Sequence, residues 1–437
     1  MSINRLLSQL VELNIKLETE GGKLKVKAPK GVVTKALHAE ISQFKEELVV
    51  FIDQKTDKLP EITPDLANRY EPFPMNPIQQ AYWFGRSSAA DYGNVACHYY
   101  VEHETDHLDI SRFNRAWQRV IAGNDMLRAV IRDDGLQQIL PSVPQYEIPV
   151  VDLREVDQDT RENCLLDARN ELSHQVLPIN QWPLFEVRIH QLPEGKARFH
   201  FSFDLLVADV MSLFSFINQW YEHYNSPELP IKAHELSFRD YIITEQEFYQ
   251  HTLYKRSLAY WRRRLPSIPM SAALPISTTP ESLANPKFKR VETRLNKSEW
   301  EALKRVSQKQ NSTVSMVMCT VFAEVIARWS KSKHFTLNMT LFNRLPIHPQ
   351  VNEIIGDFTS LNLLEVDFRQ EKTFSERVSQ LTKQFWQDME HRYVHGVDIM
   401  RELSQYHGST VLMPLIFTST IGSHDIGKSS VTFEKWF

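Results

Sequence analysis

The sequence predicts an α/β fold with a mixed sheet, preceded by a small αββα unit. From residue 71 onward, strand-like runs such as 197–207 (ARFHFSFDLLV) and 335–343 (FTLNMTLFN) alternate with helical stretches such as 111–123 (SRFNRAWQRVIAG) and 313–330 (TVSMVMCTVFAEVIARWS). The first 55 residues have their own helix–hairpin–helix pattern. A chain of 437 residues is long enough for more than one core.

The N-terminal unit, predicted over residues 1–55, starts with apolar residues at helical spacing. Residues 14–28 (NIKLETEGGKLKVKA) alternate apolar and polar positions around Gly21-Gly22, which predicts a β-hairpin. A second helix should follow Pro29 and Gly31, since one face collects apolar residues. The apolar positions of the two helices are Ile3, Leu6, Leu7, Leu10 and Val11, then Leu37, Ile41, Phe44, Leu48 and Ile52.

Three lysines, Lys23, Lys25 and Lys27, fall on the outward face of the second predicted strand. Such a face can be a solvated one that prevents edge-to-edge aggregation. It can equally be a basic strand beside which an acidic peptide adds. Both interpretations stay open from the sequence.

The remaining boundaries follow from composition. Residues 56–71 (TDKLPEITPDLANRYE) are polar, contain two prolines and lack periodicity, which predicts a linker. A Pro-rich patch around 265–286 indicates the crossing between two lobes. We therefore predict a first lobe over 72–265 and a second over 266–437.

Bulk properties exclude several function classes. A net charge of -4 and a pI near 6.5 show no excess of basic residues of the kind that binds nucleic acid. No apolar run approaches the ~20 residues that span a bilayer, and the N-terminus lacks the features of a signal peptide. The three widely spaced cysteines, Cys97, Cys164 and Cys319, suggest neither a disulfide framework nor a metal site, so we expect a cytoplasmic location.

His391 and His395 lie four residues apart and would share one face of a helix, a spacing that can indicate a metal site. No third ligand accompanies them, and the sequence predicts no bound metal.

Seven segments, in order, resemble the core motifs of the heterocyclization domains of non-ribosomal peptide synthetases, which are variants of the condensation domain. They are FPMNPIQQAYWFGR (73–86), WPLFEVR (182–188), DLLVADVMS (204–212), YWRRRLPSIP (260–269), LFNRLPIHPQVNEIIGDFTSLNLLEVD (341–367), HRYVHGVDIMREL (391–403) and PLIFTSTIG (414–422). The first 55 residues resemble the small TubC-type docking domains that precede such modules and bind the C-terminal tail of the upstream synthetase.

The resemblance implies a two-lobed, chloramphenicol-acetyltransferase-like fold. It also implies a reaction in which a carrier-bound acyl group is joined to carrier-bound Cys, Ser or Thr, and the amide is then cyclodehydrated to a thiazoline or oxazoline. The partners are donor and acceptor peptidyl carrier proteins. Their phosphopantetheine arms are the only prosthetic groups implied, so the chain itself is expected to bind no cofactor.

Site residues follow from the same motifs. Thr418 is the implied catalytic hydroxyl, because loss of water requires proton transfer at oxygen. Asp204 and Asp209 could form a general acid/base pair, but Asp209 is more readily explained by a structural ion pair with Arg344. Leu205 replaces the histidine of ordinary condensation domains. Ser212 completes the Asp-x4-Asp-x2-Ser signature, and Asp357 either lines the tunnel or caps a turn.

The sequence departs from the family at two places. Gly123-Asn124 precede Asp125 where the family has Arg-His, and the chain ends at Phe437 before the family's Ser-Gln-Thr-Pro-Gln-Val motif. We therefore expect a C-terminally incomplete cyclization domain. The alternatives are a truncated chain that no longer cyclizes and a module that serves only for docking.

Overall fold

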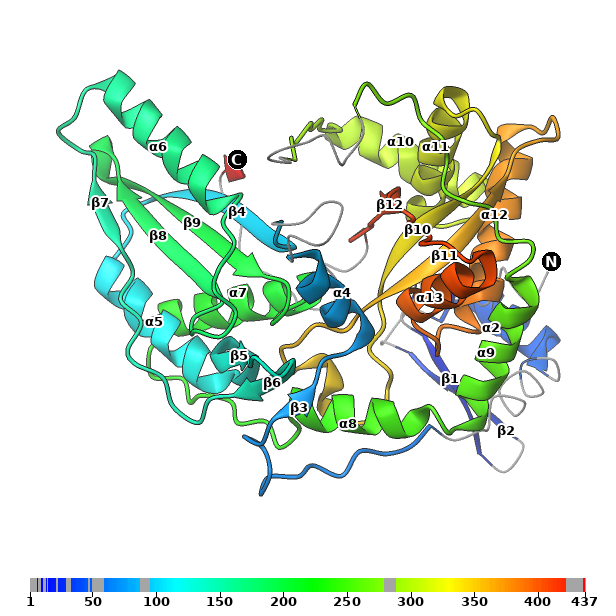
Figure 1. Cartoon of the computed structure of the whole chain (residues 1–437), viewed down its shortest axis with the longest axis horizontal. Helices are drawn as coiled ribbons and strands as arrows, with labels where there is room; N and C mark the ends of the chain where they lie inside the picture. The colour runs from blue at the N-terminus through cyan, green and yellow to red at the C-terminus, as the bar shows by residue number, and fades with distance from the viewer. Residues whose placement is uncertain are drawn as a thin grey trace.

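The computed structural model describes residues 6, 9–10, 13, 15–20, 23–28, 33–45, 48, 59–86, 95–278, 288–421 and 435–436. Within these residues the chain forms a small N-terminal domain and a two-lobed α/β body, as predicted (Figure 1).

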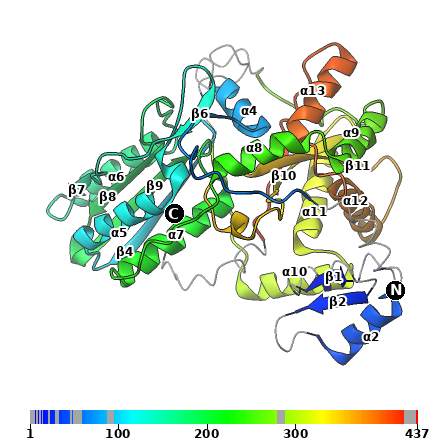
Figure 2. The same ribbon diagram turned by 90° about the horizontal axis from the view of Figure 1, so that it is seen from below.

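The N-terminal domain contains the predicted hairpin. β1 (Lys16–Glu20) and β2 (Lys23–Lys27) pair antiparallel, with Leu17 opposite Val26. α2 (Lys35–Gln43) starts at Thr34, whose side chain accepts a hydrogen bond from the Leu37 backbone N–H. The buried core consists of Leu6, Leu10, Ile15, Leu37, Ile41 and Leu48. The hairpin and α2 lie together at the lower right of Figure 2, and the predicted positions at Ile3, Leu7, Val11, Gly21-Gly22 and Ile52 fall outside the described residues.

The N-terminal lobe is built on a sheet of strand order β13-β4-β9-β8-β7. These strands are β4 (His98–Asp106), β7 (Val150–Asp152), β8 (Phe185–Gln191), β9 (Lys196–Asp204) and β13 (Lys435–Trp436), all antiparallel to their neighbours except β7 beside β8. A smaller sheet joins β3 (Phe73–Pro74), β6 (Leu136–Ile139) and β5 (Ala129–Ile131).

The alternation along β9 explains which helices cover which face of the main sheet. Phe199, Phe201 and Phe203 pack in the core with α5 (Ile110–Gly123) and α7 (Val210–Asn225). The intervening Ser202 donates a hydrogen bond to the Leu172 carbonyl of α6 (Gln158–Leu172), which covers the opposite face. Figure 1 shows this layering at the left of the molecule.

The C-terminal lobe has the strand order β11-β10-β12. β10 (His334–Phe342) pairs antiparallel with β11 (Thr359–Asp367) and parallel with β12 (Ile416–Phe417). The remaining helices are α4 (Pro77–Gly85), α8 (Phe238–Phe248), α9 (Thr252–Arg264), α10 (Lys297–Lys309), α11 (Val314–Trp329), α12 (Phe374–Met389) and α13 (Gly396–His407), with short 3₁₀ turns at Asp125–Arg128, Pro193–Gly195 and Pro349–Asn352.

The predicted lobe boundary at 265/266 is misplaced. Trp261 and Leu265, at the end of α9, pack in one cluster with Leu363 and Leu403 of the C-terminal lobe. The chain reaches the second lobe before residue 265, and Phe238 of the preceding helix α8 packs in the large cluster that holds the β9 phenylalanines together with Phe358 of the loop before β11. Within the described part of the Pro-rich patch, Ser271 instead forms a bridge with Thr336 of β10 in the C-terminal sheet. At the other end of the chain, β13 joins β4 of the N-terminal lobe, so the second lobe does not extend unbroken to residue 437.

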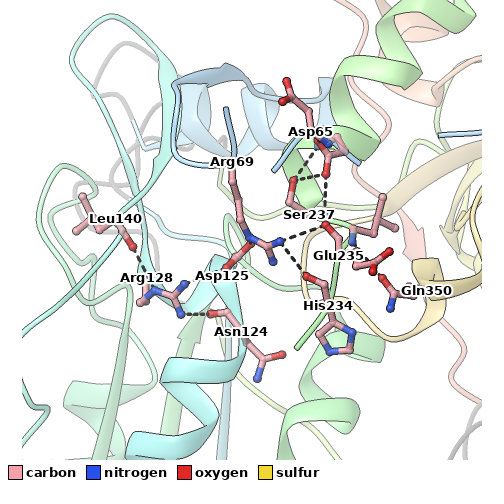
Figure 3. Close-up of polar contacts among 12 residues, drawn as sticks. Asp65, Arg69, Asn124, Asp125, Arg128, Leu140, His234, Glu235, Ser237 and Gln350 are labelled. Atoms are coloured by element: carbon pink, nitrogen blue, oxygen red, sulfur yellow. Dashed lines mark hydrogen bonds and ion pairs between the residues drawn. The ribbon is translucent and has the colours of Figure 1, made fainter. Parts of the chain in front are cut away.

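Residues 59–71 of the predicted linker pack against the body. Ile62 is buried in the core of the first lobe. The backbone at Asp65 is also held in place, because its N–H donates a hydrogen bond to the Asp240 carboxylate. Arg69 forms an ion pair with Asp125 at 2.8 Å and donates hydrogen bonds to the His234 and Glu235 carbonyls (Figure 3). This part of the segment is fixed in place on the domain.

No single described helix is long and apolar enough to cross a membrane. α10 and α11 pass that test only as a pair, and they are bent by 94° at their junction.

Candidate active site

Asp209, the second aspartate of the 204–212 signature, caps the start of α7. Its carboxylate accepts hydrogen bonds from the backbone N–H groups of Ser212 (2.7 Å) and Phe358 (3.3 Å). The same carboxylate lies 3.1 Å from the guanidinium of Arg344, and the Asp209 side chain is fully buried. The ion pair that the sequence predicts between Asp209 and Arg344 is therefore present, and it joins the two lobes.

Arg344 and Ser212 extend this contact to the loop before β11. Arg344 donates to the Ser212 hydroxyl at 2.8 Å, and that hydroxyl donates to the Gly356 carbonyl at 2.7 Å. The guanidinium also lies 3.9 Å from the centre of the Phe358 ring. A side chain at Gly356 would meet the Phe238 ring at 2.2 Å, so only glycine fits here. The residues of the signature thus hold the Gly356–Phe358 loop against α7 and α8.

Asp204, the first aspartate of the signature, ends β9 and is 2% exposed. It forms an ion pair with Arg86, at the end of α4, and accepts a hydrogen bond from the Leu206 backbone N–H. Burial raises the pKa of Asp204, although Arg86 opposes that rise. Because its carboxylate is occupied by Arg86, the geometry favours a positioning role over the catalytic role predicted for it.

Asp357 caps a turn, which is one of the two roles predicted for it. Its Oδ1 accepts a hydrogen bond from the Thr359 backbone N–H at 2.9 Å. The side chain is fully buried, and Oδ2 has no hydrogen-bond partner among the described residues. Burial raises the pKa of Asp357 to about 7, with Asp209 adding to the rise and His395 opposing it.

Asp357 is expected to make stability depend on pH. Its carboxyl keeps a proton in the folded chain up to about pH 7, whereas in the unfolded chain it loses that proton near its ordinary pKa of 3.8. Stability from this group is therefore greatest at acid pH, falls as the pH rises between these two pKa values, and stays low above the folded pKa.

An Asp357→Asn variant should lose this pH dependence, because the amide keeps the acceptor for Thr359 and does not titrate. The free energy of unfolding, measured in urea for both chains across this pH range, gives a difference curve in which the other titrating groups cancel. A difference that is flat with pH would show that Asp357 is ionised throughout.

Thr418, the predicted catalytic hydroxyl, follows the short strand β12 and is exposed. Its Oγ1 lies 2.8 Å from the Oγ1 of Thr340 on β10. The neighbouring Ser419 bonds in the same way to Ser315 of α11 at 2.8 Å. Figure 1 shows β12 at the edge of its sheet that faces the N-terminal lobe. The hydroxyl is accessible, and its described partner is another hydroxyl rather than Asp204 or Asp209.

The two histidines considered as metal ligands do not share a helix. α12 ends at Met389 and α13 begins at Gly396, so His391 and His395 lie in the connection. His391 stacks on Tyr260 with ring centres 3.9 Å apart, and His395 lies 3.2 Å from the Glu245 carboxylate. Burial alone would lower the pKa of His395, but Glu245 raises it overall. Within the described residues, no group of three potential ligands surrounds a metal position.

Residues 71–426 match the Condensation domain family, and residues 3–54 match the TubC N-terminal docking domain. The chain belongs to the condensation-domain family. This condensation domain is 33% identical over 425 residues to pyochelin synthetase PchF of Pseudomonas aeruginosa, covering 97% of the chain and 23% of that relative. It is 32% identical over 375 residues to phenyloxazoline synthase MbtB of Mycobacterium tuberculosis, covering 84% of the chain and 26% of the relative.

Among solved structures, the condensation domain and its docking domain together resemble the EpoB NRPS cyclization-docking bidomain from Sorangium cellulosum. The TM-score is 0.81 at 36% identity, and the match covers 95% of this chain and 83% of that one. The chain spans about a quarter of the length of the curated relatives named above.

Two contacts of this condensation domain were not anticipated from its sequence. Arg86 was noted only as part of a motif, and no local pattern links it to Asp204, 118 residues away. The Thr340–Thr418 contact depends on the parallel pairing of β10 with β12, which joins residues 78 apart.

Proposed function

We propose that this chain is the heterocyclization domain of a non-ribosomal peptide synthetase. It would join an upstream carrier-bound acyl group to carrier-bound Cys, Ser or Thr and cyclodehydrate the product to a thiazoline or oxazoline. The observation that supports this most directly is the match over nearly the whole chain to a cyclization-docking bidomain. The signature with Leu205 between Asp204 and Asp209 supports it further, because this site lacks the histidine base of ordinary condensation domains.

In this proposal, Asp209, Arg344 and Ser212 hold the loop before β11 in place, and Asp204 fixes Arg86. Thr418 donates or relays a proton to the oxygen that leaves as water, since a hydroxyl leaves readily only when protonated. Phosphopantetheine arms would be supplied by the donor and acceptor carrier proteins, so the chain would hold no cofactor of its own. A cytoplasmic location fits the three separate cysteines, which are free thiols.

Intact-mass measurement of the acceptor carrier tests the reaction. The full chain is incubated with a loaded donor carrier and an acceptor carrier bearing Cys, Ser or Thr. Cyclization gives the mass of the amide less one water, whereas amide formation alone leaves the full mass. The second outcome would favour the alternative of a chain that condenses or docks without cyclizing.

The docking domain is proposed to bind the C-terminal tail of the upstream synthetase along β2. The side chains of Lys25 and Lys27 are exposed. In the hairpin register, Lys23 is opposite Glu20 and Lys25 is opposite Glu18, whereas Lys27 is opposite Lys16.

Charge reversal at Lys23, Lys25 and Lys27 together is expected to abolish salt-sensitive binding of an acidic tail peptide. A single reversal, Lys27→Glu, should weaken binding by up to about fivefold. Fluorescence anisotropy with a labelled tail peptide at low and high salt measures both effects. Equal affinity of the triple variant and the unaltered chain would contradict a basic docking strand.

A further inference from the structure

We propose that a groove on the N-terminal lobe, beside α5, is a docking site for an acidic peptide segment of a partner protein. The groove has a volume of about 790 Å³ and lies between α5, the loop after β6 and the end of α7. We call it the arginine groove after the four arginines that line it, Arg112, Arg115, Arg119 and Arg128. None of its lining residues is an aspartate or glutamate.

Three of these arginines come from one face of α5. Positions 112, 115 and 119 follow helical spacing, so their side chains project in nearly the same direction. Phe113, Trp117 and Val120 are buried on the other side of the helix, and the buried residues Ala116 and Ile121 also line the groove. The helix itself (ISRFNRAWQRVIAG) contains no acidic residue that could neutralise the arginines at i, i+4 spacing. Like charges gathered on one helix face destabilise it slightly, which suggests that they serve another purpose.

The contacts of these side chains fix their positions without cancelling their charge. Arg112 donates to the Asn225 carbonyl at 2.6 Å, and Arg119 donates to the Leu229 carbonyl. Carbonyl groups orient a guanidinium but carry no net charge. Arg115 is exposed, and among the described residues none of Arg112, Arg115 and Arg119 forms an ion pair with a carboxylate.

Arg128 forms a rigid end of the arginine groove. It donates to the Leu140, Ile121 and Ala122 carbonyls and forms an ion pair with Asp125 at 2.9 Å. Asp125 is shared with Arg69, as Figure 3 shows. One carboxylate therefore pairs with two guanidinium groups, and Asp125 is not among the residues that line the groove.

The spacing of the arginines favours a peptide over a single phosphate. Steps of three and four residues along a helix correspond to about 4.5 and 6 Å. Alternate side chains of an extended peptide lie about 6.6 Å apart, so successive carboxylates on one side of a strand can each meet an arginine. One phosphate could reach two of the three at most. Pro141, Pro144 and Pro227 form part of the groove wall. Because proline side chains lose little conformational freedom when they are buried, an extended segment can pack on them at a small entropic cost.

The arginine groove shares no residue with the clusters around Asp204, Asp209 or Thr418, and the inference stands whether or not the domain cyclizes its substrate. To test it, the full chain is titrated into a labelled twelve-residue peptide of alternating Glu and Thr, and into the same peptide with Gln in place of Glu. We expect the Glu peptide to bind with an affinity that falls as salt is raised, and the Gln peptide not to bind.

Arg115→Glu is the informative variant, because its side chain is exposed and supports no described contact, so the fold should be unaffected. It should weaken binding of the Glu peptide by about fivefold or more. The matched control is Arg263→Glu on α9, an exposed helical arginine with the same charge change, which should leave affinity unchanged.

Lys25→Glu separates this site from the docking strand. Retained binding in Lys25→Glu together with loss in Arg115→Glu supports the arginine groove, whatever the outcome for the docking strand. The proposal is overturned if the Glu peptide does not bind, if Arg115→Glu binds it as the unaltered chain does, or if inorganic pyrophosphate binds at the groove and the peptide does not.

Discussion

A Thr418→Ala variant is expected to form the amide at close to the normal rate and to lose water from it about 10²–10⁴ times more slowly. The expected loss is that of one positioned proton donor, because removal of a general acid or base lowers a rate by this range. Amide formation should be spared, since the attacking amine needs no leaving hydroxyl. Time courses of the carrier-bound amide and of the dehydrated product, followed by intact mass, separate the two steps.

Two neighbouring variants serve as controls for Thr418. Thr340→Val removes the hydroxyl that lies 2.8 Å from Thr418 and should slow ring formation less, because Thr418 itself remains. Ser419→Ala removes the adjacent hydroxyl, which bonds to Ser315 instead, and should leave both steps intact. An equal slowing of both steps in Thr418→Ala would point to a structural role. Unchanged water loss would remove Thr418 from the chemistry altogether.

The parts of the fold that could be predicted from sequence are those with local patterns. Gly21-Gly22 between alternating residues predicted the hairpin, and the helical spacing of Leu37, Ile41 and Leu48 predicted a face that is buried in the docking core. The Asp209–Arg344 ion pair was found for a different reason. Its prediction came from the likeness of two motifs to a family, because the residues are 135 positions apart and no spacing joins them.

The parts that were missed depend on tertiary contacts between distant segments. α9 reads as an ordinary amphipathic helix, and its sequence does not say which lobe supplies the partner of Trp261. The segment 59–71 reads as a polar linker because much of its anchoring is polar, through Arg69 and Asp65, and its apolar contacts are few, with Ile62 buried in the core and Leu59 packed against it. A segment anchored by polar contacts has the same amino-acid composition as a solvated linker, so composition alone cannot distinguish the two.

Arg344→Met is expected to lower the free energy of unfolding by about 3–5 kcal/mol, because it leaves the Asp209 carboxylate buried without its counter-charge. The two backbone N–H groups that bond to Asp209 remain and offset part of the cost. The Val351 and Ile354 carbonyls increase the loss of stability, because the variant removes the Arg344 donor that bonds to both of them. Urea unfolding of the full chain measures the change in the midpoint and in the free energy.

A surface ion pair in the same lobe provides the matched control. Arg369 pairs with Asp367 at 2.7 Å, but its side chain is 62% exposed, so Arg369→Met should cost less than about 1 kcal/mol. The double variant Asp209→Asn with Arg344→Met should cost less than the sum of its single changes, by about 0.5–3 kcal/mol, because neither charge is then left alone. Equal costs for Arg344→Met and Arg369→Met, or strict additivity in the double variant, would mean that water reaches Asp209 and that the two lobes are not joined by a desolvated charge pair.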